Sequence, residues 1–292
     1  MTKPVITVIG SINMDMVVEA ARAPDQGETL MGDSFQMIPG GKGANQAVAA
    51  ARLGARVSLI GAVGQDTFAD VLTDTLKKEG VQTAGVKHIN GVSTGVASIV
   101  LSDQDNRILV VPGANGRVDK ELVDEQKERI LTSDLVIMQL EIPVDTVTYV
   151  ASMCRDNRIP VLVNPAPAHT LSEELLEACT WLTPNETERA ALGDLPLSVR
   201  EKLIVTEGKA GARYERDGKE TVIPGHAVDV ADTTGAGDTF NGALAVQLAQ
   251  GHSLEDAIRF ANAAAALSVT KLGAQTGMPA EHEVRRLLAS QQ

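Results

Sequence analysis

The sequence is poor in the residue types that mark several common classes of protein. Its 292 residues include four Phe, two Tyr and one Trp, and two cysteines, Cys154 and Cys179. Two cysteines in segments with helical patterns do not make a disulfide framework, and their spacing is not that of a zinc site. We therefore expect buried thiols. The scarcity of aromatic side chains also argues against a surface that stacks bases.

Long apolar runs and an excess of basic residues are missing as well. No apolar run approaches the roughly 20 residues of a membrane span, and the start Met-Thr-Lys-Pro lacks the pattern of a secretory signal. We expect a cytoplasmic protein with no membrane partner. The formal net charge of −12 argues against a nucleic-acid partner, which would need a basic face to neutralise phosphates. An anionic ligand would have to bring its own cation and bind in a locally positive niche.

What the sequence does contain is 43% apolar residues and an alternation of short β-rich runs with helical patterns. The β-rich runs occupy residues 57–60, 135–140, 160–163 and 203–206. The helical patterns occupy residues 67–79, 119–131, 143–157 and 172–179. Such alternation predicts an α/β protein with a mostly parallel central sheet and helices on both faces.

Two segments break this alternation, at about residues 14–38 and 91–111. Neither has a long helical periodicity. Within the second, residues 96–101 and 107–111 flank the polar sequence Asp103-Gln-Asp-Asn106, which is typical of a β-hairpin. No repeat or low-complexity tract marks a second unit, so we expect both segments to be excursions from a single domain that spans the whole chain.

The most informative stretch is Asp232-Thr-Thr-Gly-Ala-Gly-Asp238, a glycine turn that leads into a helical run. Gly235 and Gly237 let backbone N–H groups face one point, and a helix N-terminus adds a positive dipole end, so the turn predicts an anion site. Asp238 stands beside that site as a candidate base, which suits phosphoryl transfer to an alcohol. On these residues alone, the alternative is an ordinary glycine-rich loop with an acidic residue in the first helical turn.

A second glycine turn, Pro39-Gly-Gly-Lys42-Gly-Ala-Asn45, also leads into a helix. Lys42 and Asn45 place a cation and an amide near the start of that helix. Asn13 and Asp15, which follow a short strand-like run, add further donors and acceptors. Together these side chains suit several hydroxyl groups of a polyol, whereas a lone lysine in a glycine-rich turn is usually just solvated.

Neither common phosphate-binding motif is present. No Gly-x-x-x-x-Gly-Lys-Ser/Thr occurs, and the near matches to Gly-x-Gly-x-x-Gly fail because Gln46 and Phe240 stand where the last glycine is required. The second near match also lies late in the chain and not after the first strand. A dinucleotide fold is therefore disfavoured, and with it an oxidoreductase function.

With these motifs in order, the chain resembles the ribokinase-like (pfkB) family of carbohydrate kinases over nearly its whole length. The resemblance rests on Gly10-Ser-Ile-Asn13-Met-Asp15, Gly40-Gly-Lys-Gly-Ala-Asn45, Gln139-Leu-Glu141, Pro184-Asn185-Glu-Thr-Glu188, Thr206-Glu-Gly208 and residues 232–244. It implies a three-layer α/β sandwich in which the two excursions form a small β lid. It also implies ATP-dependent phosphorylation of the primary hydroxyl of a small sugar, with D-ribose, converted to ribose 5-phosphate, as the favoured substrate.

The resemblance implies a role for each matching residue. Asp238 would be the base, and the backbone around Gly235, Ala236 and Gly237 would stabilise charge on the transferring phosphoryl group. The implied sugar site consists of Asn13, Asp15, Gly41, Lys42, Gly43, Asn45, Glu141 and Asp238. The implied nucleotide site consists of Asn185, Thr206, Glu207, Gly208, Gly211, Gly237 and Asn262.

Two of the nucleotide assignments have a structural alternative. Residues 206–211 would look the same in a plain turn between two strands. Asn262 lies in an alanine-rich helical segment, where a polar residue is as often a hydrogen-bond partner in the core.

The resemblance further implies two cations. Mg²⁺ would accompany ATP, with Asn185 and Glu188 organising its waters, because Mg²⁺ keeps much of its hydration shell. The same pair, three residues apart, also predicts a helix capping box. A monovalent activator, K⁺, is implied in a cage of mainly backbone carbonyls at Asp232, Thr234, Ser268, Lys271, Gly273 and Gly277.

Ribose and ATP are thus the expected ligands, and a homodimer formed through the lids is the expected assembly, since an exposed apolar face and sheet edge invite association. Fructose and deoxyribose remain open as substrates because their hydroxyls need similar partners. Nucleosides are less favoured because few aromatic side chains could face a base. The alternative from another functional class is a sugar-binding module without turnover. The intact Asp238 and glycine turn argue against it.

Overall fold

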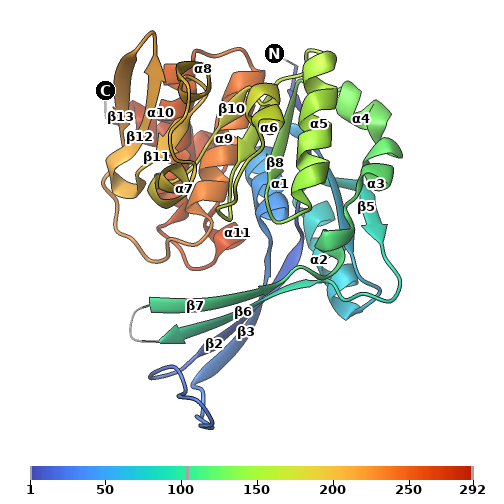
Figure 1. The fold of residues 1–292 in the computed structure, drawn as a ribbon. Helices are drawn as coiled ribbons and strands as arrows, with labels where there is room; N and C mark the ends of the chain where they lie inside the picture. The colour runs from blue at the N-terminus through green and yellow to red at the C-terminus, as the bar shows by residue number, and fades with distance from the viewer. Residues whose placement is uncertain (1, 103–104, 291–292) are drawn as a thin grey trace.

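A computed structural model provides the structure of the chain and describes residues 2–102 and 105–290. At its centre lies a six-stranded sheet in the order β10-β9-β8-β1-β4-β5, and each neighbouring pair is parallel (Figure 1). The strands are β1 (Val5–Ile9), β4 (Arg56–Val63), β5 (Gln82–His88), β8 (Leu135–Gln139), β9 (Val161–Asn164) and β10 (Trp181–Leu182). The predicted parallel α/β architecture is confirmed.

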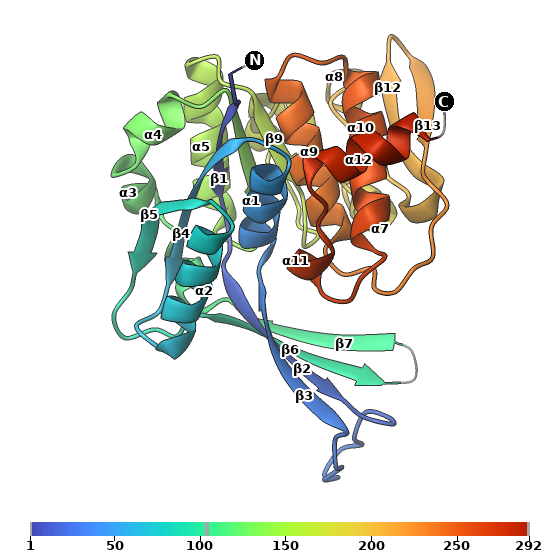
Figure 2. The same ribbon diagram turned by 180° about the vertical axis from the view of Figure 1, so that it is seen from behind.

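Helices cover both faces of this sheet (Figures 1 and 2). One face carries α1 (Lys42–Arg52), α2 (Thr67–Lys78) and α9 (Ala236–Ala249), with α10 (Leu254–Ser268) and α12 (Glu281–Ala289) packed outside α9. The other face carries α3 (Lys120–Asp124), α4 (Lys127–Leu131), α5 (Val144–Asp156) and α6 (Glu173–Ala178). The single helix expected at residues 119–131 is two short helices, interrupted where Gln126 has φ −110° and ψ 9°.

Alternate residues of the parallel strands face two separate hydrophobic clusters. In β8, Leu135 and Ile137 belong to the cluster shared with α1 and α9, whereas Val136 and Met138 belong to the cluster shared with α5. Successive side chains of a strand point to opposite faces, so a sheet covered on both sides buries nearly every strand residue. This burial explains why the strands have continuous apolar sequences.

Helices α1 and α9 pack directly against each other, most closely at Gly242. A Cβ added at Gly242 would lie 2.7 Å from Cβ of Ala49 and 2.9 Å from both the backbone nitrogen of Ala50 and the carbonyl oxygen of Gln46. Only glycine fits at this crossing. The close approach brings the first turns of both helices to the same edge of the central sheet.

A three-stranded antiparallel sheet continues one side of the molecule. It consists of β11 (Ile204–Thr206), β12 (Gly211–Arg216) and β13 (Lys219–Pro224). The strand expected at residues 203–206 is present, and isolated parallel bridges join Leu203 to Leu182 and Thr206 to Asn185. The short helices α7 (Glu186–Ala191) and α8 (Leu197–Arg200) lie between β10 and β11 in the chain.

A second sheet, called the projecting sheet below, extends away from the main body (Figures 1 and 2). Its order is β3-β2-β6-β7, built from β2 (Asn13–Glu19), β3 (Ser34–Gly40), β6 (Gly95–Ser102) and β7 (Asp105–Val111). The predicted hairpin is the antiparallel pair β6 and β7. Asp103 and Gln104, in its expected turn, lie outside the described residues.

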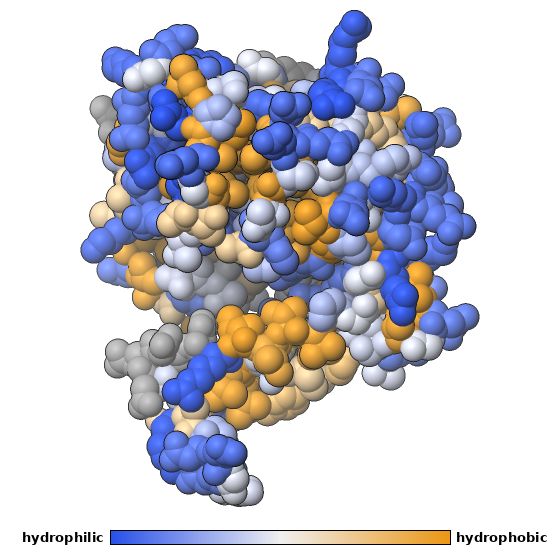
Figure 3. Space-filling view, in the orientation of Figure 1, coloured by the Kyte–Doolittle hydropathy of each residue, from blue (hydrophilic) through white to orange (hydrophobic). Residues whose placement is uncertain are grey.

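The projecting sheet leaves large apolar side chains in water. The exposed fractions of Ile108, Leu109, Val110 and Val111 in β7 lie between 45% and 69%. Figure 3 shows hydrophobic side chains gathered on this sheet in the lower half of the view. Val96 and Ile99 of β6 are half-buried.

Within the described ranges, no helix is long and apolar enough to cross a membrane.

Candidate active site

The candidate site lies at the edge of the central sheet where its parallel strands end. Strand β1 leads into Ser11, β8 into Glu141 and β10 into Thr183, and β9 ends at Asn164. The carboxyl ends of parallel strands meet at one edge, and ligands of open α/β sheets bind there. Since Ala44 donates its N–H to the carbonyl of Ser11, the start of α1 lies at this edge too.

Asp238 is buried in the first turn of α9, with an exposed fraction of 8%. Its Oδ2 accepts a hydrogen bond from Nδ2 of Asn45 at 2.9 Å, and its Oδ1 accepts one from Nε2 of Gln46 at 3.0 Å. Asn45 and Asp238 are 193 residues apart in the chain, and the structure joins them as the sequence motifs predicted. Gln46 was not among the predicted residues.

Glu141 connects the strand β8 to the start of α1. Its Oε2 accepts hydrogen bonds from Oγ of Ser11 and, at 3.1 Å, from the backbone N–H of Lys42. Ser11 also accepts a bond from the backbone N–H of Gly43 at 3.2 Å. The predicted residues Lys42, Gly43 and Glu141 therefore share one network through Ser11, a residue of the first motif that the sequence analysis did not select.

Asn13 is oriented by a residue far away in the chain. Its Oδ1 accepts a 2.7 Å bond from Nδ2 of Asn115, which also exchanges bonds with both backbone groups of Ile12. Asn115 lies in the 3₁₀ helix η1 (Gly113–Arg117), and no local pattern in the sequence links it to Asn13. The role of Asn115 cannot be predicted from the sequence because the contact depends on the projecting sheet meeting the core.

Lys42 is surrounded by negative charge. Its burial opposes the ammonium charge, but the carboxylates of Asp238, Glu141, Glu188 and Asp15 outweigh burial and raise its pKa. The structure thus brings the predicted cation and four predicted carboxylates into one electrostatic cluster. A cation kept charged in such a place is suited to binding polar groups of a ligand.

Asp15 has the opposite shift. Burial, followed by the nearby Glu141 and Asp238, raises its pKa from the ordinary 3.8 to about 7, although Lys42 acts against this. Its carboxylate lies directly over Gly40, where an added Cβ would be 2.3 Å from Oδ2. Asp15 is therefore held in a site that disfavours its charge in the free protein.

The glycines of the second motif have a visible structural role. Gly41 has φ 91°, and a Cβ there would lie 2.7 Å from the backbone nitrogen of Asn13. A Cβ at Gly43 would lie 2.5 Å from the carbonyl carbon of Gly10. Both positions need glycine for the close approach of backbones, and direct sugar contacts by them stay predictions.

The predicted anion turn leads into α9 as expected. Gly235 is the N-cap with φ 78°, and Ala236 and Gly237 are the first two helical residues. The first N–H groups of an α-helix have no partner within the helix, so they face the same edge as Asp238 with a positive dipole end. The geometry fits an anion site next to the carboxylate.

Four of the predicted nucleotide residues, Thr206, Glu207, Gly208 and Gly211, lie on the segment from the end of β11 to the start of β12, and Asn262 lies on α10; Asn185 and Gly237 lie at the starts of α7 and α9. Residues 206–211 include the 3₁₀ turn η2 (Gly208–Ala210), in which Glu207 donates its N–H to the carbonyl of Gly211 and pairs with Arg213 at 2.6 Å. Nδ2 of the buried Asn262 donates to the carbonyls of Ile223 at 2.9 Å and Pro224 at 3.1 Å. Both are the structural alternatives considered above, and nucleotide contacts by these residues stay predictions.

Asn185 and Glu188 form the expected capping box at the start of α7. Glu188 donates its N–H to Oδ1 of Asn185 at 2.8 Å, and Asn185 donates its N–H to Oε2 of Glu188 at 2.9 Å. Burial raises the pKa of Glu188, and Asp238 adds to this, against the bond from Asn185 and the charge of Lys42. The described residues contain no group of three or more His, Cys, Asp or Glu side chains that could hold a metal ion.

Asp232 joins the two loops of the predicted monovalent cation site. Its carboxylate accepts bonds from the backbone N–H and hydroxyl of Thr234, at 2.9 and 2.6 Å, and from the N–H of Gly273 at 2.8 Å. Burial opposes its charge, but these donors lower its pKa. The other residues predicted for this site lie between the end of α10 and the short helix α11 (Ala274–Gly277): Ser268, Lys271 and Gly277.

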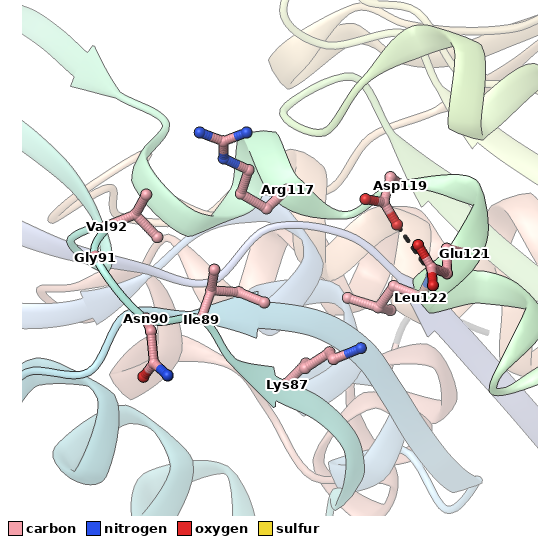
Figure 4. Close-up of a pocket in the computed structure, with 9 residues that line it drawn as sticks. All are labelled: Lys87, Ile89, Asn90, Gly91, Val92, Arg117, Asp119, Glu121 and Leu122. Carbon is pink, nitrogen blue, oxygen red and sulfur yellow. Dashed lines mark hydrogen bonds between the residues drawn. The ribbon is translucent and has the colours of Figure 1, made fainter.

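A separate surface pocket of about 390 Å³ lies between the end of β5 and α3 (Figure 4). It is lined by Lys87, Ile89, Asn90, Gly91, Val92, Arg117, Asp119, Glu121 and Leu122. None of these residues belongs to the predicted site.

The sequence pattern of pfkB family carbohydrate kinases matches residues 3–281. The chain belongs to this family. It is 48% identical over 291 residues to a ribokinase of Bacillus subtilis, covering 97% of this chain and 99% of that protein. It is 35% identical to a deoxyribokinase of Salmonella typhi, covering 97% and 98%.

Solved structures give the same relationship for this pfkB kinase. The Arabidopsis thaliana ribokinase complexed with ribose and ATP superposes with a TM-score of 0.90 at 33% identity, over 98% of this chain and 99% of that one. The ribokinase of Thermotoga maritima gives 0.87 at 36% identity, over 98% and 99%. The resemblance predicted from the motifs is confirmed at the level of family and fold.

Proposed function

We propose that this protein transfers the γ-phosphoryl group of ATP to the primary hydroxyl of D-ribose, giving ribose 5-phosphate and ADP. The 48% identity to a ribokinase and the likeness to a ribokinase that binds ribose and ATP support this assignment. The observation that carries it is the buried carboxylate of Asp238, which lies in the first turn of α9 and is held by Asn45.

On the sugar side, the side chains around Lys42 supply the binding groups. Asn13, Asp15, Lys42, Asn45 and Glu141 offer both donors and acceptors to vicinal hydroxyls, a pairing that an apolar pocket could not provide. Ribose would place its primary hydroxyl against Asp238. The transition state of phosphoryl transfer is loose, so Asp238 mainly orients the hydroxyl and takes its proton late.

On the nucleotide side, the N-terminus of α9 stabilises charge on the transferring phosphoryl group. The N–H groups at the start of α9 are already oriented before reaction, so little reorganisation is needed, although that of Ala236 bonds the carbonyl of Thr233 at 3.3 Å. Mg²⁺, when bound with ATP, neutralises the phosphate oxygens. The single buried carboxylate of Glu188, fixed by Asn185, suits contact with the waters of such an ion better than a protein cage of its own.

A monovalent cation bound between the two loops around Asp232 and Gly273 would stabilise the conformation of the anion turn. Asp232 already fastens the loop before α9 to the loop at Gly273, and backbone carbonyls of these loops suit a large, weakly hydrated ion such as K⁺. Rates in potassium and sodium buffers of equal ionic strength and Mg²⁺ content test this. Equal rates in the two buffers would refute activation by K⁺ at this site.

The projecting sheet is proposed as the lid of the sugar site and as the dimer interface. Strands β2 and β3 lead directly from the sugar residue Asn13 and back to Gly40, so their position is coupled to the site. The exposed apolar side chains of β7 and its open edge suit the lid of a second copy. A two-fold dimer would cover them.

A coupled ADP-release assay across ribose, deoxyribose, fructose and adenosine tests the proposed function. We expect the highest kcat/KM with ribose. Deoxyribose is the second candidate because of the 35% identity to a deoxyribokinase. ADP release no faster with any of these sugars than without sugar would refute a sugar kinase, and a highest kcat/KM with deoxyribose would replace ribose.

A further inference from the structure

Asp238 is one end of a buried chain of amide side chains. Nε2 of Gln46 donates to Oδ1 of Asp238 at 3.0 Å and to Oδ1 of Asn164 at 3.2 Å, while Oε1 of Gln46 accepts from Nε2 of Gln139 at 2.7 Å. Nδ2 of Asn164 donates to the backbone carbonyl of Thr183 at 2.9 Å. Four buried side chains from α1, α9, β8 and β9 are thereby linked.

The direction of this chain is fixed by its two ends. An ionised carboxylate and a backbone carbonyl only accept hydrogen bonds. Thr183 therefore requires the nitrogen of Asn164, and Asn164 turns its oxygen toward Gln46. Asp238 and Asn164 both require the nitrogen of Gln46, whose oxygen must then face Gln139. Because both ends agree, the amide of Gln46 has one orientation, with its N–H groups toward Asp238.

The two amides that hold Asp238 differ in what a ligand can reach. Asn45 is 5% exposed and belongs to the proposed sugar site, whereas Gln46 is fully buried. At the crossing of α1 and α9, a Cβ added to Gly242 would lie 2.9 Å from the carbonyl oxygen of Gln46, so the backbone of Gln46 lies directly against α9. A bound sugar can replace the bond from Asn45 to Oδ2, but it cannot displace Gln46 from Oδ1.

We propose that Gln46 is a positioning residue that holds Oδ1 of Asp238 and leaves Oδ2 as the oxygen that accepts the proton of the sugar hydroxyl. This inference rests on the proposed role of Asp238 as base. Gln46 acts from inside the core and touches neither substrate.

The primary test is kinetic comparison of Gln46→Met with wild type. The variant removes the donors at similar volume, so we expect kcat to fall about 10- to 100-fold, the worth of a hydrogen bond to a charged group, with both KM values unchanged within about threefold. Gln247→Met is the matched control. Gln247 is buried further along α9 and donates to Gln250, so this variant should keep the wild-type kcat.

A second variant, Gln46→Glu, adds a signature that a purely structural role would not give. An introduced carboxylate faces Asp238 as a like charge at neutral pH, whereas its protonated form can donate an O–H in place of the lost N–H. The ratio of its kcat to that of wild type should therefore rise as the pH is lowered from 8 to 6. Asp15, Lys42 and Glu188 are the charged groups that interact with Asp238, with Glu141 beside them, and all are unchanged in the variant.

The outcomes of these experiments distinguish a failure of the inference about Gln46 from a failure of the proposed function. Wild-type kcat in Gln46→Met, while Asp238→Asn loses about 10²- to 10⁴-fold, would overturn the inference and leave the function intact. An inactive wild type would refute the function itself. If the Gln46 variants do not fold, a crystal structure of the wild type with ribose decides: Nε2 of Gln46 bonded to Oδ1 and the primary hydroxyl nearest Oδ2 support the inference, and the reverse arrangement overturns it.

Discussion

The six-stranded sheet buries both of its faces, whereas the projecting sheet leaves much of its apolar surface in water. Every residue of β8 is at most 1% exposed, while Ile108, Leu109, Val110 and Val111 of β7 are 45% to 69% exposed. Close packing on all sides holds a buried side chain in a single conformation. A sheet with one face in water has fewer contacts to hold it, and gains more only when a ligand or another protein surface covers that face. Asp238, the proposed base, thus belongs to the part fixed by folding, whereas the projecting sheet is the part that we propose is completed by ligands or a partner.

The same contrast separates two carboxylates of the site. Asp238 lies in the core and is held by the amides of Asn45 and Gln46. Asp15 lies on β2 of the projecting sheet, where burial raises its pKa to about 7. One carboxylate is prepared for its role before any ligand binds. The other is in a place that disfavours its charge in the free protein.

The largest expected effect comes from breaking the fixed part. Asp238→Asn should lower kcat by about 10²- to 10⁴-fold, the usual contribution of a positioned acid or base, while the affinities for ribose and ATP stay within a few-fold. Steady-state kinetics with binding calorimetry measures both. A variant that retains more than about a tenth of the wild-type kcat would remove Asp238 from the role of base.

The next largest effect is expected from Asp15, which should make the stability of the free protein depend on pH. The folded pKa of Asp15, about 7, is above its ordinary value of 3.8, so its contribution to stability is present below about pH 4 and is lost as the pH rises to about 7. The pKa of Asp15 is raised by about three units, and each unit corresponds to about 1.4 kcal/mol. Reduced for partial exposure, this gives a loss of about 2 to 4 kcal/mol in the free energy of unfolding.

Chemical denaturation without sugar tests this at pH 5 and pH 8. Asp15→Asn should gain stability relative to wild type as the pH rises, and we also expect it to weaken sugar binding. Asp33→Asn, which changes an exposed carboxylate, is the control and should show no such trend. The same stability difference between Asp15→Asn and wild type at both pH values would contradict the unfavourable burial of Asp15.

A smaller effect is expected at the helix crossing beneath the site. Gly242→Ala would place a Cβ 2.9 Å from backbone atoms of α1, and overpacking of this kind costs about 1 to 3 kcal/mol of unfolding free energy. Separating α1 from α9 would also lengthen the bonds to Asp238, so kcat should fall. Gly116→Ala is the control, since its Cβ would have only Pro112 nearby, at 4.0 Å. Equal thermal stability of both variants would show that the crossing tolerates a side chain.

The smallest effect on the core is expected from changing the projecting sheet. Leu109→Asp adds a charge to a side chain that is 69% exposed, so it should split a dimer without unfolding the central sheet. Val222→Asp, at a 53% exposed position on β13, is the control that should stay dimeric. Light scattering at micromolar concentration gives the mass. A wild-type mass equal to the chain mass of 30.7 kDa would contradict the lid interface.

The sequence predicted those parts of the site that follow from local patterns. The glycine turn before Asp238 and the Asn185-to-Glu188 capping box both appear in the structure, because turns and helix caps are determined within a few residues. The parallel strands were predicted from short apolar runs and the helices from the helical patterns between them. Both patterns are local as well.

The residues that the sequence did not reveal act through contacts between distant segments. Gln46 reaches Asp238 across 192 positions, and Asn115 reaches Asn13 across 102. An amide in the core looks like any other polar residue until the crossing of α1 and α9 shows which carboxylate it faces. Such roles depend on tertiary packing and have no periodicity of their own.

The central claim is that the phosphoryl group goes from ATP to the primary hydroxyl of ribose and not to water. Phosphorus NMR of a reaction containing ribose, ATP, Mg²⁺ and K⁺ tests it most directly, because it identifies the product and its position at once. We predict ribose 5-phosphate in equal amount to ADP, with both products formed about 10²- to 10⁴-fold more slowly by Asp238→Asn. Inorganic phosphate in equal amount to ADP, or a phosphate on another hydroxyl, would contradict it.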